Sequence, residues 1–279
     1  MLLKAAHKKI SGAAGLILRE LGIFFKGAAG NLFTREFLTL LIPLLGLWEL
    51  LPRLGAVSDK LVPPPGEVAV TFWTMITERG FLADIGDSMI RFFLGLGLAI
   101  IAAIPTGLLM GWNMSIRKRM LPLFQLLSPI PPPAWVPITI ILFGVGLPMQ
   151  IFLIFLAAFY PIVFNTYQAV KDTDPRYLSS ARIFGASELT LILRVYFWNA
   201  VGAIIMSVKT GVAMGLVMLV IAEMYGGRTG IGYVLNEAKD YFRISQMVVC
   251  MLTLGFIGWF LIEILKFVEL KLAIWKGAR

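Results

Sequence analysis

The chain has 279 residues, of which 58% are hydrophobic and only 15% are charged. Soluble domains average about 25% charged and 45–50% apolar residues, so the composition excludes an ordinary soluble domain and indicates an integral membrane protein. The single cysteine and single histidine exclude an internal disulfide and a metal site built from clustered histidines or cysteines.

The first segment of the chain, residues 1–36, is basic and has no apolar run long enough for a cleaved signal peptide. Its stretch "GAAGLIL" is followed directly by Arg19 and Glu20. Apolar residues on one helical face predict an amphipathic helix lying on the inner surface of the membrane; these residues are Ile17, Leu18, Leu21, Phe24 and Phe25. An unstructured basic tail is the alternative.

Apolar windows long enough to cross a bilayer occur six times along the sequence. The predicted spans cover roughly 37–54, 88–111, 120–145, 148–170, 199–222 and 247–269. We therefore expect an all-α integral membrane protein with six transmembrane helices. In this division 37–81 holds the first helix and an outer loop, 82–270 is the main transmembrane domain, and 271–279 is a cytoplasmic tail.

The distribution of lysine and arginine predicts the orientation of these spans. Most of the basic residues in the flanks lie in the N-terminal segment, in the loops after the second and fourth spans, and at the C-terminus. Cytoplasmic loops carry this excess in membrane proteins, so both termini are predicted to face the cytoplasm. The net charge of +9 then needs no nucleic-acid partner to explain it, because the lipid bilayer accounts for its placement.

The stretch "SPIPPPAWVP" at 128–137 places five prolines inside the third predicted span. Proline removes a helix hydrogen bond, and backbone freed in this way is tolerated at membrane depth only where protein buries it or a water-filled cavity adjoins it. The span is therefore predicted to be broken and to face the interior. Ser128, Pro131, Pro132 and Trp135 are candidates for lining the path of a solute, and a packing kink is the alternative.

The loop at 171–198 is the longest loop on the predicted cytoplasmic side. Asp174 followed by Pro175 is typical of a helix start, and Gly185 can end that helix in the left-handed conformation. Ser187 and Glu188 can then start a second helix. The pattern predicts a short helix, a glycine turn and another helix exposed to the cytoplasm, which is the form of a docking element.

Two further positions are candidates for contact with a solute or a partner. Lys209 lies about ten residues into the fifth predicted span, and an ionisable residue there usually faces the bundle interior or a cavity. It is either an attractive charge for an anionic solute or a structural residue, which pairs with a carboxylate or helix carbonyls or snorkels to the membrane interface. Glu223, with Gly230 and Gly232 in the following turn, lies at the outer mouth and could close a gate or contact a delivery protein, with a solvated loop as the alternative.

The loop also resembles a known motif. "SSARIFGAS" is similar to the EAA loop of ABC importer permeases, with Ser179, Ser180 and Ala181 at the Glu-Ala-Ala positions and Gly185 as the glycine. The likeness extends to "VPPPGEV", "LFQLLSPIPPPAWVPITIILFG" and "VIAEMYGGRTGIGYVLNEA", which resemble the nitrate, sulfonate and taurine branch of those permeases.

The resemblance implies the fold and the partners of this chain. It implies a six-helix permease in the bacterial inner membrane that pairs with a second permease subunit, two ATP-binding cassette subunits on the inner face and an external solute-binding protein. An identical second subunit is the default expectation for closed symmetric assemblies. ATP and Mg²⁺ would belong to the partner ATPases, with no cofactor on this chain, and the solute would be nitrate, bicarbonate, taurine or an alkanesulfonate. The residues expected to couple to the ATPase are Asp174, Pro175, Leu178, Ser179, Ser180, Ala181, Gly185 and Ala186.

Other classes of function fit the residues less well. The sequence contains no G-x-x-x-x-G-K-[ST] motif for phosphate binding, so we expect this chain to be no enzyme and to take its energy from a partner. A secondary transporter driven by an ion gradient is the alternative, but it would favour paired acids within the membrane, and the predicted spans contain almost no carboxylates. A membrane scaffold would have no need of a docking loop.

Overall fold

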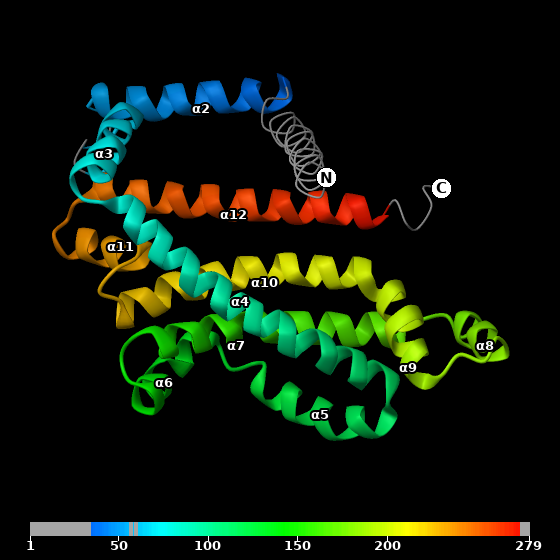
Figure 1. Cartoon of the computed structure of the whole chain (residues 1–279). Helices are drawn as coiled ribbons and strands as arrows, with labels where there is room; N and C mark the ends of the chain where they lie inside the picture. The colour runs from blue at the N-terminus through cyan, green and yellow to red at the C-terminus, as the bar shows by residue number, and fades with distance from the viewer. Residues whose placement is uncertain (1–34, 56–57, 59–60, 274–279) are drawn as a thin grey trace, which may run out of the picture.

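The computed structural model describes residues 35–55, 58 and 61–273 (Figure 1). The predicted interfacial helix therefore lies almost entirely outside the described residues, as does most of the predicted tail. Every regular element within the described ranges is helical. This agrees with the all-α prediction.

The helices follow one another with short connections. The first part of the chain forms α2 (Arg35–Arg53), α3 (Pro65–Glu78), α4 (Phe81–Trp112), α5 (Met114–Leu127), a 3₁₀ turn (Pro132–Trp135), α6 (Val136–Phe143) and α7 (Leu147–Lys171). The second part forms α8 (Pro175–Ile183), α9 (Glu188–Thr190), a π-helical stretch (Leu191–Tyr196), α10 (Phe197–Gly226), α11 (Ile231–Asp240) and α12 (Ile244–Ala273).

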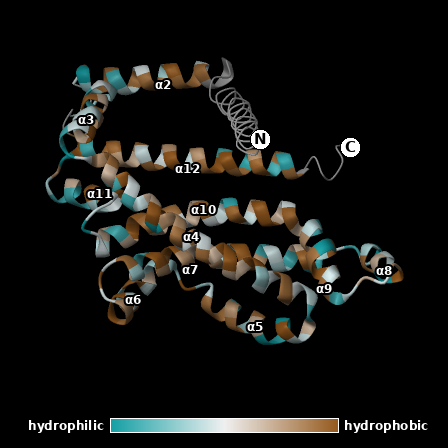
Figure 2. Cartoon of the chain, viewed as in Figure 1, coloured by the Kyte–Doolittle hydropathy of each residue, from teal (hydrophilic) through white to brown (hydrophobic). Residues whose placement is uncertain are grey.

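Four of the described helices are long and apolar enough to cross a bilayer. They occupy Phe81–Trp112, Leu147–Lys171, Glu188–Gly226 and Ile244–Leu272. A fifth span is possible if α5 and the segment Pro132–Phe143 count as one, since they meet at a bend of 87°. Figure 2 shows hydrophobic residues predominating along α4, α7, α10 and α12.

The described part of the chain contains fewer candidate spans than the six predicted from the sequence. The stretch predicted as the first span does form a helix, α2, but charged residues lie near both of its ends. They leave no sufficiently apolar window of spanning length, and α2 is absent from the candidate spans. In Figure 1, α2 lies apart from the main bundle and α3 leads from it to the start of α4.

The core of the protein lies between α4, α7 and α10. Its largest cluster of buried side chains includes Phe92 on α4, Ile154 and Ile162 on α7, and Leu219 on α10. Association of helices in lipid depends on close van der Waals packing, and glycine permits this approach. A Cβ atom at Gly111 would lie 2.4 Å from side-chain atoms of Val170 on α7, so α4 and α7 can be this close only because position 111 has no side chain.

A second cluster joins the helices at the end of the bundle opposite α8. Val68 and Met75 of α3, Ile231 of α11, and Val249 and Cys250 of α12 are buried together there. α11 lies between α10 and α12 at this end (Figure 1). The packing holds the turn between α10 and α11 against the start of α4, and this turn forms one wall of the site described next.

Candidate functional site

The turn after α10 is held by a buried carboxylate. Glu223 has no accessible surface, and its carboxylate accepts hydrogen bonds from Ser88 Oγ at 2.8 Å, Arg91 Nη1 at 2.7 Å and the backbone N–H of Gly232 at 2.8 Å. A buried charge is tolerated when it is paired and hydrogen-bonded in this way. Glu223 therefore ties α4 to the start of α11.

The same turn is fastened to α4 by further hydrogen bonds. Asp84 Oδ1 accepts from the backbone N–H of Gly230 at 2.8 Å, and Ser88 Oγ accepts from the N–H of Ile231 at 2.9 Å. Gly230 has φ of +110°, and a Cβ there would lie 2.4 Å from Glu223 Oε1. Glycine at position 230 is thus required by both the backbone conformation and the carboxylate beside it.

This geometry corrects one part of the sequence-based expectation. Glu223 was predicted to contact a delivery protein or to close an outer gate. Its side chain has no exposed surface, which argues against direct contact with another protein, while the role in an outer gate stays a prediction. Its partners on α4 were not predicted. The sequence did contain a pattern that could have identified them: Asp84, Ser88 and Arg91 lie at positions i, i+4 and i+7 of that helix, which is the spacing of one helical face.

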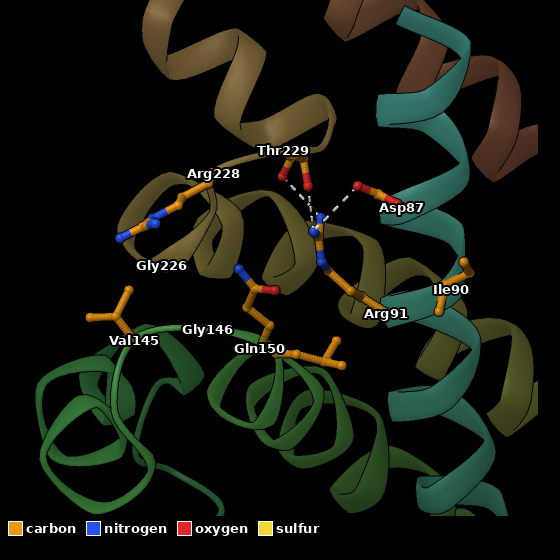
Figure 3. A pocket seen from close by; sticks show the side chains of 10 residues that line it. Asp87, Ile90, Arg91, Val145, Gly146, Gln150, Gly226, Arg228 and Thr229 are labelled. Atoms are coloured by element: carbon orange, nitrogen blue, oxygen red, sulfur yellow. Dashed lines mark hydrogen bonds and ion pairs between the residues drawn. The ribbon is translucent and has the colours of Figure 1, made fainter.

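A pocket of about 410 Å³ adjoins this network (Figure 3). Asp87, Ile90 and Arg91 of α4 form one wall, residues 145–147 and Gln150 at the start of α7 form another, and Gly226, Arg228 and Thr229 form the third. Arg91 donates to both the carbonyl oxygen and the hydroxyl of Thr229, at 2.9 and 2.7 Å. The pocket lies at the end of the bundle opposite α8, and the sequence analysis did not foresee it.

The proline-rich segment breaks the helix as predicted. α5 ends at Leu127, Ser128 is its C-cap, and the chain turns by 87° before α6. Pro131 is exposed, whereas Ser128, Pro132 and Trp135 are partly buried. The Trp135 ring packs against the cluster that includes Met149 of α7 and Met218 of α10, and its indole N–H, although buried, has no hydrogen-bond partner among the described residues.

Lys209 forms an ion pair with Glu269 near the end of α12. The side chains are 15% and 35% exposed, so both charges are largely enclosed by the protein. Of the two alternatives left open by the sequence, this geometry favours the structural pair over a free attractive charge. Glu269 was missed because it lies 60 residues away in the chain, and no local pattern joins the two positions.

The loop after α7 forms the predicted helix, glycine turn and second helix. Asp174 Oδ1 accepts from the N–H of Arg176 at 2.8 Å and so begins α8. Gly185 has φ of +77°, its N–H bonds to the carbonyl of Arg182, and the N–H of Ala186 bonds to the carbonyl of Ala181. This pair of bonds is a Schellman motif. Ser187 Oγ then accepts from the N–H of Thr190 at 3.3 Å.

The side chains of this loop divide into two groups. Leu178, Ala181 and Ala186 pack partly against the main core and so hold the loop to the bundle. Ile183 and Phe184 are 83% and 90% exposed. The predicted coupling residues that do not pack on the core also lie on the surface: Asp174, Pro175, Ser179, Ser180 and Gly185. Phe184 was not among the predicted coupling residues, although it directly precedes the helix-ending glycine.

Residues 95–269 match the family of binding-protein-dependent transport system inner membrane components. The chain belongs to this family. It is 32% identical over 232 residues to a protein of Brucella abortus named a probable ABC transporter permease, covering 83% of this chain and 92% of that protein. It is 30% identical to the nitrate import permease protein of Leptolyngbya laminosa, covering 81% of this chain and 82% of the relative.

A further relative of this permease is the taurine transport system permease protein of Escherichia coli. The two are 28% identical over 240 residues, covering 84% of this chain and 87% of the relative. These matches confirm the resemblance to the nitrate, sulfonate and taurine branch of ABC importer permeases. The permease is a multi-pass membrane component of a transport system, and its relatives are permeases and not enzymes. Within the described ranges, His, Cys, Asp and Glu form no cluster that could hold a metal ion.

Proposed function

We propose that the permease forms the translocation path of an ATP-driven importer for a small anion or sulfonate-like solute. Two copies of the chain, two ATP-binding cassette subunits and an external solute-binding protein make up the complex. ATP and Mg²⁺ are bound by the ATPases, and both termini of the permease face the cytoplasm of a bacterial cell. Membership of the family supports the class of complex, while its stoichiometry and orientation belong to the proposal.

The observation that carries the proposal is the exposed turn formed by α8 and Gly185. It protrudes from one end of the bundle (Figure 1) and presents Ile183 and Phe184 to solvent. Two large apolar side chains on a capped helix are costly to leave in water and are suited to a hydrophobic groove on a partner. An ATPase docked there would transmit its movements through Leu178 and Ala181, which pack on the core.

The relatives support the proposed class of solute. Relatives are named for transport of taurine, nitrate and aliphatic sulfonates, all of which are small oxyanions or bear a sulfonate group. We propose that the broken third span, with Ser128, Pro131, Pro132 and Trp135, borders the path of such a solute. Its irregular backbone and the unpartnered indole N–H of Trp135 support this, because such groups in lipid would be costly.

Reconstitution in liposomes tests the proposal. The permease is co-expressed with its ATPase, purified, and supplied with the binding protein and with labelled taurine, nitrate or ethanesulfonate. We expect uptake of at least one solute that requires ATP and stops when the ATPase carries a substitution in its own phosphate-binding lysine. Uptake that follows an imposed ion gradient without ATP would instead support a secondary transporter.

A further inference from the structure

We propose that the pocket between α4, α7 and α10 binds the oxyanion group of the transported solute, with a short organic sulfonate as the preferred ligand. The inference rests on the proposed function and adds to it a site and a chemical class. It stands on three groups around the pocket: a buried amide without a partner, an arginine without a carboxylate partner, and the first residues of α7.

Gln150 is the first of these groups. Its side chain is 1% exposed, yet the described part of the chain offers its amide no hydrogen-bond partner. Figure 3 shows the amide pointing into the pocket, between Arg91 and Arg228. A buried amide without a partner is unfavourable, and buried polar groups normally have one. A ligand in the pocket would supply the missing partner, and the amide N–H can donate to an oxyanion.

Arg228 supplies a positive charge. Its side chain is exposed beside the pocket, and no carboxylate pairs with it among the described residues. Arg91, by contrast, is paired with Glu223 at 2.7 Å and has Asp87 at 3.8 Å. Arg91 is therefore shared between two carboxylates and has no free positive charge to offer a ligand. Among the lining residues, Arg228 is the cation with no carboxylate within ion-pair distance in the described part of the chain, and its planar guanidinium can donate two parallel hydrogen bonds to a sulfonate or nitrate.

The start of α7 completes the set of donors. This helix is 25 residues long and begins after Gly146, directly at the pocket. Pro148 has no N–H and the N–H of Gln150 donates to the carbonyl of Gly146, so the free donors of the first turn are the N–H groups of Leu147 and Met149. The helix dipole is positive at this end. Gly146 has φ of +141° and nothing within 4 Å of the position of an added Cβ, so a ligand can approach the backbone closely. Anions bind readily at such helix N-termini.

The rest of the lining indicates the body of the ligand. Ile90, Val145 and Leu147 contribute apolar surface, and a pocket of about 410 Å³ is larger than nitrate requires. Small-molecule sites combine apolar lining with a few converging polar groups. The combination here fits an anionic head with a short hydrocarbon chain better than a bare inorganic anion.

Direct binding to the assembled complex tests this inference. The permease with its ATPase is placed in nanodiscs without the binding protein, and ethanesulfonate is titrated by saturation-transfer NMR, with nitrate as a competitor. We expect ethanesulfonate to bind, nitrate to displace it at higher concentration, and ethylammonium, which has the same hydrocarbon chain, not to bind. Displacement by nitrate at lower concentration would identify an inorganic-anion site and overturn the preference for a sulfonate.

Two variants locate the site. Arg228→Gln should weaken ethanesulfonate binding about tenfold, since it removes a charge-assisted bidentate contact. The control is Arg243→Gln, which changes another exposed arginine at the same end of the bundle and should bind like the wild type. Gln150→Glu places a carboxylate in the pocket and should abolish binding. Gln150→Met keeps a similar size and should bind several-fold more weakly than wild type while leaving the thermal midpoint of the complex unchanged.

Different results would contradict the proposed binding site and the proposed transport function. Absence of ethanesulfonate and nitrate binding by the wild type, or equal affinity in Arg228→Gln and wild type, would overturn the pocket while ATP-driven uptake with the binding protein continued. Failure of all such uptake by the wild type would count against the proposed function itself.

Discussion

Arg91 on α4 and Glu223 on α10 form an ion pair with 2.7 Å between Nη1 and Oε1, although 132 residues separate them in the chain. The carboxylate is fully buried and the arginine side chain is 12% exposed. Ser88 and the backbone N–H of Gly232 complete the shell of donors. The pair therefore joins the start of α4, the end of α10 and the turn into α11, and it supports one wall of the pocket.

Removing the arginine should destabilise the permease strongly. Arg91→Met leaves Glu223 buried without its counter-charge, and breaking one side of a buried pair costs about 3–5 kcal/mol. Unfolding of the purified permease in mixed micelles measures the loss. The control is Arg53→Met, because the pair of Arg53 with Glu49 is exposed and such pairs contribute about 0–1 kcal/mol. Equal losses in the two variants would contradict a stabilising role for the buried pair.

Gly185 should be replaceable only by residues that accept a positive φ. Gly185→Val forces a β-branched residue into the left-handed conformation at a cost of about 1–3 kcal/mol, and it should distort the α8 turn and reduce ATP-driven uptake while membrane insertion stays normal. Gly185→Asn is the matched control, since asparagine tolerates this conformation, and it should transport nearly as well as wild type. Wild-type uptake by Gly185→Val would remove the turn from the coupling mechanism.

Phe184 should be needed for docking but not for folding. Its side chain is 90% exposed, so Phe184→Asp removes no internal contact and should leave the thermal midpoint of the isolated permease unchanged. Co-purification of the ATPase should fall at least tenfold, since burial of a phenylalanine side chain contributes about 1.5–3 kcal/mol. The control is Phe242→Asp, a phenylalanine that is 86% exposed in the turn between α11 and α12, and these helices meet at the end of the bundle opposite α8 (Figure 1). If Phe184→Asp retains the ATPase as well as this control does, docking takes place elsewhere.

The broken third span should be accessible to water during transport. Single cysteines at Ser128 and Ala134, in a Cys250→Ala background, should react with a membrane-impermeant thiol reagent in at least one nucleotide state. A cysteine at Ala158, which is fully buried in the core, should not react under the same conditions. Protection of positions 128 and 134 in every state would leave only a packing kink.

Lys209 should stabilise the complex through Glu269 and not through the solute. Lys209→Met should lower the thermal midpoint, and the double-mutant cycle with Glu269→Met should give a coupling on the order of 1 kcal/mol. Uptake per folded complex should stay unchanged. A roughly tenfold fall in uptake at unchanged stability, equivalent to about 1.4 kcal/mol, would instead show that Lys209 acts on the solute.

The elements that the sequence predicted correctly are those governed by local chemistry. The prolines at 129 and 131–133 remove four N–H donors within five residues, so the break of the α-helix between α5 and α6 follows from the residues themselves. Asp174, Gly185 and Ser187 cap or end helices by contacts within a few residues, so the form of the loop after α7 was also predictable from the sequence. The count of six spans did not follow in this way, because α2 is apolar but charged near its ends, and it is not among the candidate spans of the described residues.

The sequence by itself determined that this is a helical membrane protein, that the helix breaks between α5 and α6, and the shape and family likeness of the loop after α7. Only the tertiary structure decided that Glu223 is buried against Ser88 and Arg91, that Lys209 pairs with Glu269, and that Gln150 faces a pocket beside Arg228. The physical reason is that caps and proline breaks depend on neighbouring residues, whereas these pairings depend on the rotation and depth at which separate helices pack. Close contacts such as Gly111 against Val170 set that packing, and such contacts join positions that no local pattern connects.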